Sequence, residues 1–208
     1  LSVSIIAQQT PANDQLEPIS IEGGIAHLGN GKVMTNSLIM FKAGKIIFVE
    51  SAMTKIARIG KVIKANGKHV YPGFIAANTS LGLVEIDAVK ASSDERETGF
   101  MNPHIRSLIA YNAESKIVES MRPNGVFIAQ VTPRGGTISG TSSIMQLDAW
   151  NWEDASLKTD DAIHLNWPSS FKSGRWWLGE DPALKPDKNY IKNITKITSY
   201  FKDAKNYL

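Results

Sequence analysis

The sequence predicts an α/β fold in which a small antiparallel β unit precedes a layer of strands and helices. Three observations support this prediction. Short strands separated by turn residues fill residues 18–72. Two apolar strands with a helical segment between them follow, from residue 74 to residue 131. An amphipathic helical pattern then occupies residues 189–208.

Turn residues divide the first unit into its strands. Gly29-Asn30-Gly31-Lys32 predicts a turn, because Gly and Asn tolerate positive φ. Lys42-Ala43-Gly44 predicts the turn of a hairpin, and Asn66-Gly67 is the strongest short hairpin signal. The strands predicted around these turns lie at residues 19–22, 25–28, 37–41, 45–49, 62–65 and 69–71.

The second unit changes to the pattern of a parallel layer. Its elements in order are an apolar strand at 74–77, a helix at 113–121, a buried strand at 126–131, a glycine-rich loop at 133–143, a strand at 144–147 and the helix at 189–208. The first helix should stop at Arg122-Pro123-Asn124-Gly125, where Pro and Gly break it. The glycine-rich loop could expose backbone N–H groups to an anion, or could be a plain connection.

Composition excludes several classes of function. The chain has 208 residues, of which 42% are hydrophobic, enough for one large domain or two small ones. A net charge of +3 is scattered without a basic run, so we expect no nucleic-acid partner. The absence of cysteine excludes disulfides and thiolate zinc sites. No stretch approaches the roughly 18 apolar residues of a membrane span.

Residues 1–17 are interpreted as a signal-peptide remnant and a polar leader. Residues 1–7 are apolar with small side chains, and residues 8–15 are polar and turn-rich. This order is typical of the end of a signal peptide, with cleavage near Ala7. An ordinary short strand is the alternative. The first interpretation predicts an exported protein, periplasmic or secreted.

The stretch "PGFIAANTS" at residues 72–80 resembles the first barrel strand of the amidohydrolase superfamily, in particular its imidazolonepropionase-like exported members. That strand typically reads Pro-Gly-Phe-Ile-Asp-x-His-x-His. Here Ala76 takes the acidic place, and Asn78 and Ser80 take the two histidine places. The later "NGVFIAQVTPRGGTISGTSS" is similar to a subsequent barrel strand with its loop. The resemblance covers roughly residues 19–165.

This resemblance implies a β-sandwich over residues 18–72 and part of a (β/α)8 barrel over residues 73–208. A whole barrel takes about 250 residues, so it would be incomplete in this chain. The same polypeptide or another chain would supply the rest as a partner. The activity implied is metal-assisted hydrolysis of a C–N bond, with zinc or another divalent metal if ligands lie beyond residue 208.

Strand alternation places Asn78 and Ser80 on one face at the rim where barrel active sites lie. A neutral carbonyl and a hydroxyl suit zinc poorly, so we predict no metal ligand on this strand and assign both residues to substrate binding. Arg134 is a further candidate, because its guanidinium can bind a substrate carboxylate through two hydrogen bonds.

The four histidines show no metal-binding spacing. We interpret His27 and His69 as structural, whereas His104 and His164 lie in segments that could border a site. The acidic residues between 85 and 97 fit a solvated loop better than a paired-carboxylate hydrolase.

All five tryptophans lie between residues 150 and 177. Exposed indoles could stack on sugars, whereas buried ones would pack the loops that cap the barrel. We expect burial for most of them. Trp150 and Trp152 stand in a polar segment and are candidates to border a pocket.

Three functions follow from these observations. The first is an exported amidohydrolase-like enzyme that hydrolyses C–N bonds in a small molecule or peptide. The second is a catalytically inactive protein of the same fold that binds a ligand or a partner. The third is sugar binding through the tryptophans between Trp150 and Trp177.

Overall fold

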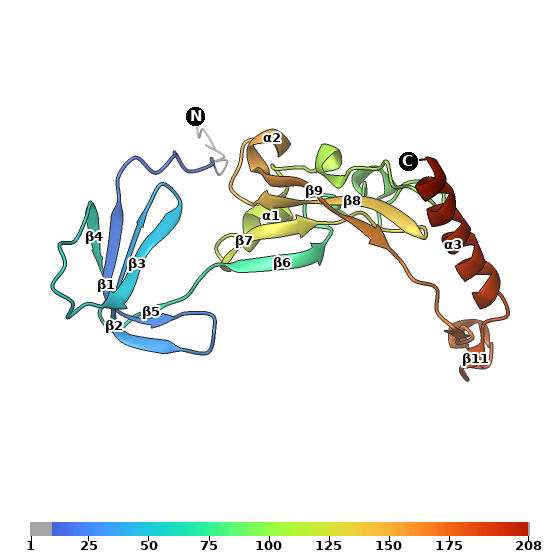
Figure 1. Ribbon diagram of the computed structural model, residues 1–208, viewed down its shortest axis with the longest axis horizontal. Coiled ribbons are helices and arrows are strands. Elements are labelled where there is room, and N and C mark those ends of the chain that lie inside the picture. The colour runs from blue at the N-terminus through green and yellow to red at the C-terminus, as the bar shows by residue number, and fades with distance from the viewer. Residues whose placement is uncertain (1–9, 208) are drawn as a thin grey trace, which may run out of the picture.

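The computed structural model describes residues 10–207 and shows two β units in succession, joined at residues 71–73 (Figure 1). The strands are β1 (Ile19–His27), β2 (Val33–Lys42), β3 (Lys45–Ser51), β4 (Lys61–Lys64), β5 (His69–Val70), β6 (Phe74–Thr79), β7 (Val126–Val131), β8 (Ile138–Gln146), β9 (Ser156–Leu165), β10 (Phe171–Lys172) and β11 (Lys185–Pro186). The helices are α1 (Lys116–Met121), α2 (Trp152–Ala155) and α3 (Tyr190–Tyr207), with 3-10 turns η1 (Lys90–Ser92), η2 (Ser107–Ala110) and η3 (Trp176–Leu178).

The N-terminal sheet has the order β3-β2-β1-β4, with β5 also beside β1. The β2–β3 hairpin is confirmed, and its turn places Ala43 and Gly44 at φ of 50° and 70°. The hairpin predicted at Asn66-Gly67 is wrong, because β4 and β5 both run parallel to β1 and do not pair with each other. The turn at Asn66-Gly67 instead lies beside a bulge in β1, where Gly23 leaves room for the Asn66 side chain.

This sheet is one layer within residues 10–207. Segment 52–60 lies on the face that carries Ser20 and Met40, since the Ser20 hydroxyl donates to the Ile59 carbonyl over 2.8 Å. The opposite face is apolar and shallowly hollowed between Ile21, Phe41 and Tyr71. The described chain forms no second sheet facing it, so the β-sandwich stays a prediction.

The second sheet has the order β6-β7-β8-β9. β6 and β7 run parallel with α1 between them, which confirms the predicted strand–helix–strand unit. β8 and β9 add antiparallel, whereas successive barrel strands run parallel. The loop predicted at 133–143 is wrong from residue 138 on, because Ile138–Gln146 forms one strand. The fold is therefore mixed α/β, and the eight-stranded barrel stays a prediction.

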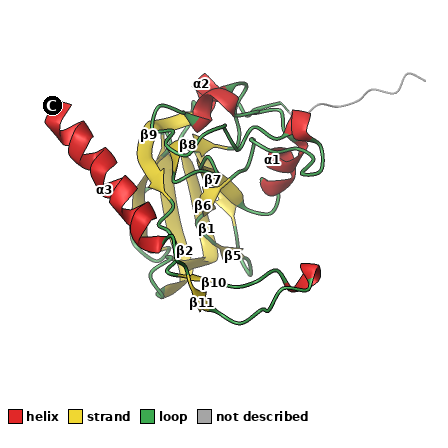
Figure 2. Ribbon diagram, turned by 90° about the vertical axis from the view of Figure 1, so that its right-hand side faces the viewer, coloured by secondary structure: helices red, strands yellow, loops and turns green. Residues whose placement is uncertain are grey.

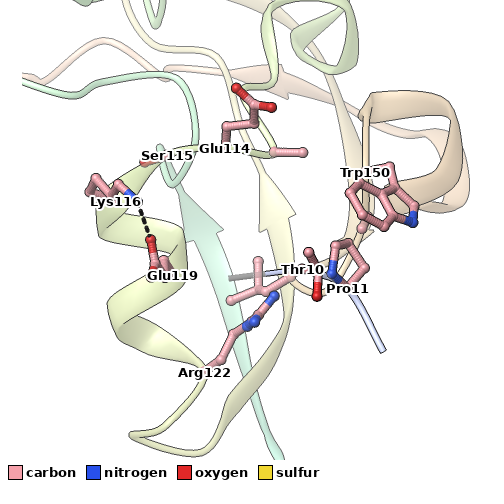
Figure 3. A pocket seen from close by; sticks show the side chains of 11 residues that line it. Thr10, Pro11, Glu114, Ser115, Lys116, Glu119, Arg122 and Trp150 are labelled. Carbon is pink, nitrogen blue, oxygen red and sulfur yellow. Dashed lines mark hydrogen bonds and ion pairs between the residues drawn. The ribbon is translucent and has the colours of Figure 1, made fainter. Parts of the chain in front are cut away.

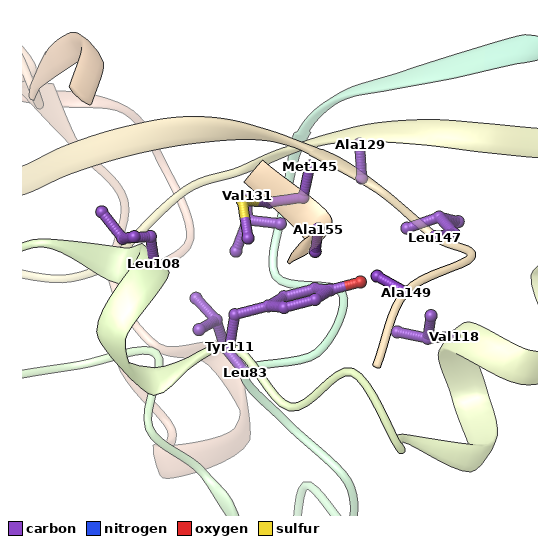
Figure 4. Close-up of a cluster of buried hydrophobic side chains, with 10 residues drawn as sticks. All are labelled: Leu83, Leu108, Tyr111, Val118, Ala129, Val131, Met145, Leu147, Ala149 and Ala155. Atoms are coloured by element: carbon purple, nitrogen blue, oxygen red, sulfur yellow. The ribbon is translucent and has the colours of Figure 1, made fainter. Parts of the chain in front are cut away.

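The core of the second unit lies between this sheet and the segments around α1 (Figure 4). Tyr111 lies among Leu83, Val118, Met145 and Ala149. The predicted helix at 113–121 is confirmed as α1, which begins after Ser115. The Ser115 hydroxyl accepts from the backbone N–H groups of residues 117 and 118, as an N-cap does.

The predicted C-terminal helix is confirmed as α3, at the end of the second unit (Figure 2). Of its apolar face only Ile197 is buried, while Ile191 and Phe201 are exposed. Among residues 10–207, no helix combines the length and apolarity needed to cross a membrane.

Residues 1–9, which carry most of the signal-peptide interpretation, lie outside the described residues. Residues 10–17 form no helix or strand and bridge the two units. The Ala12 N–H donates to Asp148 over 3.1 Å, and the Gln15 amide donates to the Phe41 carbonyl over 3.3 Å.

Candidate functional site

A connected set of polar side chains crosses the second sheet on the face opposite its core. On β7, Gln130 alternates with Ala129 and Val131, which belong to the core, and therefore points to the other face. The polar set comes from the ends of β6 and β7, the turn after β7, and the strands β8 and β9. We call it the rim network, and its members are Asn78, Gln130, Arg134, Ser142, Asp161 and His164.

Asn78 and Arg134 form the first contact of the rim network. One terminal nitrogen of Arg134 donates to the Asn78 side-chain oxygen over 2.8 Å, and the other donates to its backbone oxygen over 2.6 Å. Asn78 has a φ of 50°, a left-handed conformation that Asn tolerates better than most residues. Its N–H donates to Gln130 Oε1 over 3.2 Å. Two neutral oxygens of Asn78 thus hold the Arg134 guanidinium, and Gln130 holds Asn78 against β7.

The left-handed turn at Asn78 changes the geometry that alternation predicts. β6 ends at Thr79, and Ser80 begins a turn in which its carbonyl accepts from the Leu83 N–H over 2.9 Å. The prediction that Asn78 and Ser80 share one strand face is therefore wrong. Ser80 is half-buried beside the rim network and is not bonded into it.

Asp161 joins the remaining members. Its carboxylate accepts from Gln130 Nε2 over 2.9 Å and from the Ser142 hydroxyl over 2.6 Å. Because a carboxylate only accepts, the single hydroxyl proton of Ser142 belongs to this bond. His164 Nε2, at 2.7 Å from the same hydroxyl oxygen, must then be the donor. The donor pattern assigns the Nε2–H tautomer to His164 and leaves a lone pair on its Nδ1.

Burial favours the neutral form of His164. Burial lowers the pKa of His164, the Asp161 carboxylate opposes this, and the Arg134 charge lowers it further. A neutral imidazole with a free Nδ1 lone pair can accept a proton or a hydrogen bond from a ligand.

Arg134 differs from the other arginines of the chain. Arg58, Arg96, Arg106, Arg122 and Arg175 each form an ion pair with a carboxylate. Within the described part of the chain, Arg134 has no carboxylate partner, and its guanidinium keeps its Nε–H and one N–H on each terminal nitrogen for other bonds. It is a fixed positive charge just beyond the carboxyl end of β7.

These residues do not fit zinc or a similar divalent metal. Asn78 Oδ1 already accepts from a guanidinium cation, which repels a metal ion, and Ser80 offers only a hydroxyl. Among residues 10–207, no three His, Asp or Glu side chains gather into a cluster that could hold a metal. No step of a metal-dependent reaction can be assigned to these side chains.

The remaining predicted site residues lie elsewhere. Trp150 follows the far end of β8 and lines a pocket of about 150 Å³ with Pro11 and Arg122 (Figure 3). Trp152 begins α2 and packs against the core. His104 is exposed beside a hollow with Glu97 and is not part of the rim network.

The expectation that most tryptophans are buried is wrong. Trp150, Trp167, Trp176 and Trp177 are 63%, 57%, 72% and 65% exposed. The segment that carries Trp176 and Trp177 is a two-stranded excursion, β10–β11, with no buried residue to pack on. This excursion and α2 lie on opposite sides of the second unit (Figures 1 and 2), so the tryptophans do not form one cluster.

Sequence reasoning missed three members of the rim network and one histidine pair. Gln130 carried a usable signal, because it is a polar residue inside an otherwise apolar strand. Ser142 was assigned to a loop, and Asp161 to no site. His27 and His69 lie 42 residues apart and share a hydrogen bond of 2.8 Å, a contact that sequence spacing cannot reveal.

Comparison with known proteins supports the fold. No family model matches the chain, and no curated protein does either. An amidohydrolase from Thermotoga maritima MSB8 is similar over 91% of this chain and 48% of its own, with a TM-score of 0.72 and 19% identity. The chain thus spans about half the length of that enzyme. At this identity the similarity shows a shared fold.

Two further solved structures match smaller parts of the chain. An uncharacterized protein covers 53% of this chain with 18% identity and a TM-score of 0.36, over 24% of its own length. A prolidase complexed with N-methylphosphonate-L-proline covers 54% with 17% identity and a TM-score of 0.37, over 25% of its own length. These scores are too low to support an argument.

Proposed function

We propose that this chain belongs to an amidohydrolase-like protein whose rim network binds the carboxylate of a small molecule or peptide. One observation carries the proposal: Arg134 alone among the arginines of residues 10–207 has no carboxylate partner, although Asn78 holds it rigidly. A fixed guanidinium with free N–H groups matches a carboxylate through two charge-assisted hydrogen bonds.

The rest of the rim network supports this role. Asn78 fixes the plane of the guanidinium, so little side-chain freedom is lost when a ligand binds. His164 offers Nδ1 as an acceptor for an N–H group of the same ligand. A ligand with an amide N–H next to a carboxylate satisfies both side chains.

The function that this geometry supports best is ligand binding by a catalytically inactive protein of this fold, with no metal bound at β6. Metal-dependent hydrolysis of a C–N bond is the second candidate, favoured by the fold shared with the Thermotoga amidohydrolase. Because no three His, Asp or Glu side chains cluster within residues 10–207, it requires further metal ligands from the same or another chain. Export of the protein is proposed from the sequence of residues 1–17.

Calorimetric titration with N-acetylglycine and its neutral analogue N-acetylglycinamide tests the proposal. We expect the acid to bind at least tenfold more tightly than the amide. Arg134→Gln should remove that preference, and Arg134→Lys should restore only part of it, because ammonium lacks the planar fork. Arg106→Gln, which changes a paired and exposed arginine, is the matched control.

Equal affinity for the acid and the amide would contradict carboxylate recognition, as would an unchanged affinity in Arg134→Gln. Release of glycine from N-acetylglycine only when zinc is added would establish the second candidate instead.

A further inference from the structure

The N-terminal sheet brings two distant histidines into contact. Nε2 of His27 lies 2.8 Å from Nδ1 of His69. His27 ends β1, and β5 runs parallel beside it with Ile25 opposite His69 and Ala26 opposite Val70. Backbone pairing of two adjacent strands therefore places the two side chains next to each other.

Tyr71 restrains the pair further. Its ring stacks on His27 with centroids 4.1 Å apart and an interplanar angle of 11°. His69 is exposed and His27 is half-buried, so solvent reaches the facing nitrogens. The Tyr71 ring therefore restrains the histidine pair at His27, and the pair is exposed to solvent at His69.

The spacing of the two nitrogens matches the requirement of a metal ion. With metal–nitrogen bonds of about 2.0–2.1 Å, two neighbouring ligand nitrogens lie about 2.9 Å apart at a right angle and about 3.3 Å apart in a tetrahedron. The observed 2.8 Å lies close to both values. The ring centroids are 5.1 Å apart, so the two nitrogens point at each other, and both rings must turn about their side-chain bonds before their lone pairs meet at one ion. Imidazole nitrogen suits zinc, copper and nickel.

We propose that His27 and His69 form a binding site for a divalent transition metal, with water in the remaining coordination positions. No third His, Asp or Glu within residues 10–207 completes a cluster there, so the site is open and of modest affinity. It is independent of the rim network and of the function proposed for it, because the two lie in different sheets.

Protons must rearrange when the metal binds. In the present hydrogen bond, one of the facing nitrogens carries a proton and donates, and the other accepts the bond through its lone pair. Coordination needs a lone pair on both, so the donor ring shifts its proton to its outer nitrogen and each neutral ring keeps one proton.

Isothermal titration of NiCl₂ into the untagged chain at pH 7.5 tests the site. We expect one Ni²⁺ per chain, with affinity at least tenfold lower in His27→Gln and in His69→Gln. His104→Gln should bind as the wild type does, since His104 lies in the second unit beside a separate hollow. Circular dichroism spectra of all variants verify that they are folded.

Two readouts separate specific coordination from unspecific surface binding. The electron paramagnetic resonance spectrum of added Cu²⁺ should show splitting from two nitrogens in the wild type and should lose it in either variant. Ni²⁺ should raise the melting temperature of the wild type and not that of His69→Gln. Wild-type binding no tighter than that of His69→Gln, or binding lost in His104→Gln, would overturn the proposal.

Discussion

Replacing Gln130 by Glu probes the rim network with the smallest possible change of shape. The wild-type amide accepts from the Asn78 N–H through Oε1 and donates to Asp161 through Nε2 over 2.9 Å. In Gln130→Glu the first bond remains, whereas the second becomes a contact between two carboxylates. Either the pair stays doubly charged, or it takes up a proton that restores the donor.

These two alternatives set the size of the expected fall in the free energy of unfolding. A lost hydrogen bond to a charged group costs about 1.5–3 kcal/mol, and repulsion between the carboxylates adds to it. The loss of stability cannot exceed the free energy of protonating one carboxyl at pH 7, because protonation restores the hydrogen-bond donor. That free energy is about 4 kcal/mol for an ordinary glutamic acid. We therefore expect the free energy of unfolding to fall by about 2–4 kcal/mol at pH 7.

The sign of the pH dependence follows from the shared proton. Repulsion raises the folded-state pKa of the carboxyl pair above the unfolded value, so the variant keeps its stability in acid and loses it as pH rises through the folded-state pKa. At pH 4 the difference from the wild type should fall below about 1 kcal/mol, because protonation is then almost free.

Urea unfolding followed by tryptophan fluorescence from pH 4 to pH 8 measures both quantities. Gln146→Glu is a matched control on β8, because its amide donates to the Asp154 backbone carbonyl near solvent and contacts no buried carboxylate. Equal stability of Gln130→Glu and the wild type at pH 7, or a difference independent of pH, would refute the bonding pattern assigned to the rim network.

Three further substitutions test the second unit, each by urea unfolding. Tyr111→Phe removes a buried hydroxyl that has no hydrogen-bond partner among residues 10–207 and should stabilise the fold by about 1–2 kcal/mol. Since burial raises the pKa of Tyr111 to about 12, the unfolded chain ionises first, and the wild type should also lose stability relative to this variant between pH 10 and pH 12. Ser115→Ala removes the α1 cap and should cost about 1 kcal/mol, whereas Ser120→Ala should cost less. Gly140→Ala should cost about 1–3 kcal/mol, because φ is 133° and the new Cβ would lie 2.7 Å from the Ile105 carbonyl oxygen. Unchanged stability in any of the three variants would contradict the physical reason given for that variant.

Local signals predicted the elements that local interactions determine. The β2–β3 turn, α1 and α3 follow from glycine placement, a helix breaker and apolar spacing, and the structure confirms all three. The parallel pairing of β6 and β7 followed from the order strand, helix, strand. The sequence could not distinguish the pairing of β4 and β5 with each other from their pairing with β1, because Asn66-Gly67 permits both.

The candidate site was predicted as separate residues and not as an arrangement. Asn78, Arg134 and His164 belong to the rim network, whereas Trp150 and Trp152 lie elsewhere. The Asn78–Arg134 bonds join residues 56 positions apart, and the Gln130–Asp161 bond joins residues 31 apart. Such contacts depend on strand register, and the register of β8 was hidden by glycines that indicate a loop.

The resonance of the Arg134 Nε–H group tests the central claim most directly. In a ¹⁵N-labelled sample this signal can be assigned by its loss in Arg134→Lys, and the five ion-paired arginines serve as internal controls. We predict that N-acetylglycine shifts the Arg134 signal, that N-acetylglycinamide leaves it unchanged, and that the five control signals do not move. A shift caused equally by the neutral amide, or no shift at saturating N-acetylglycine, would contradict carboxylate binding at the rim network.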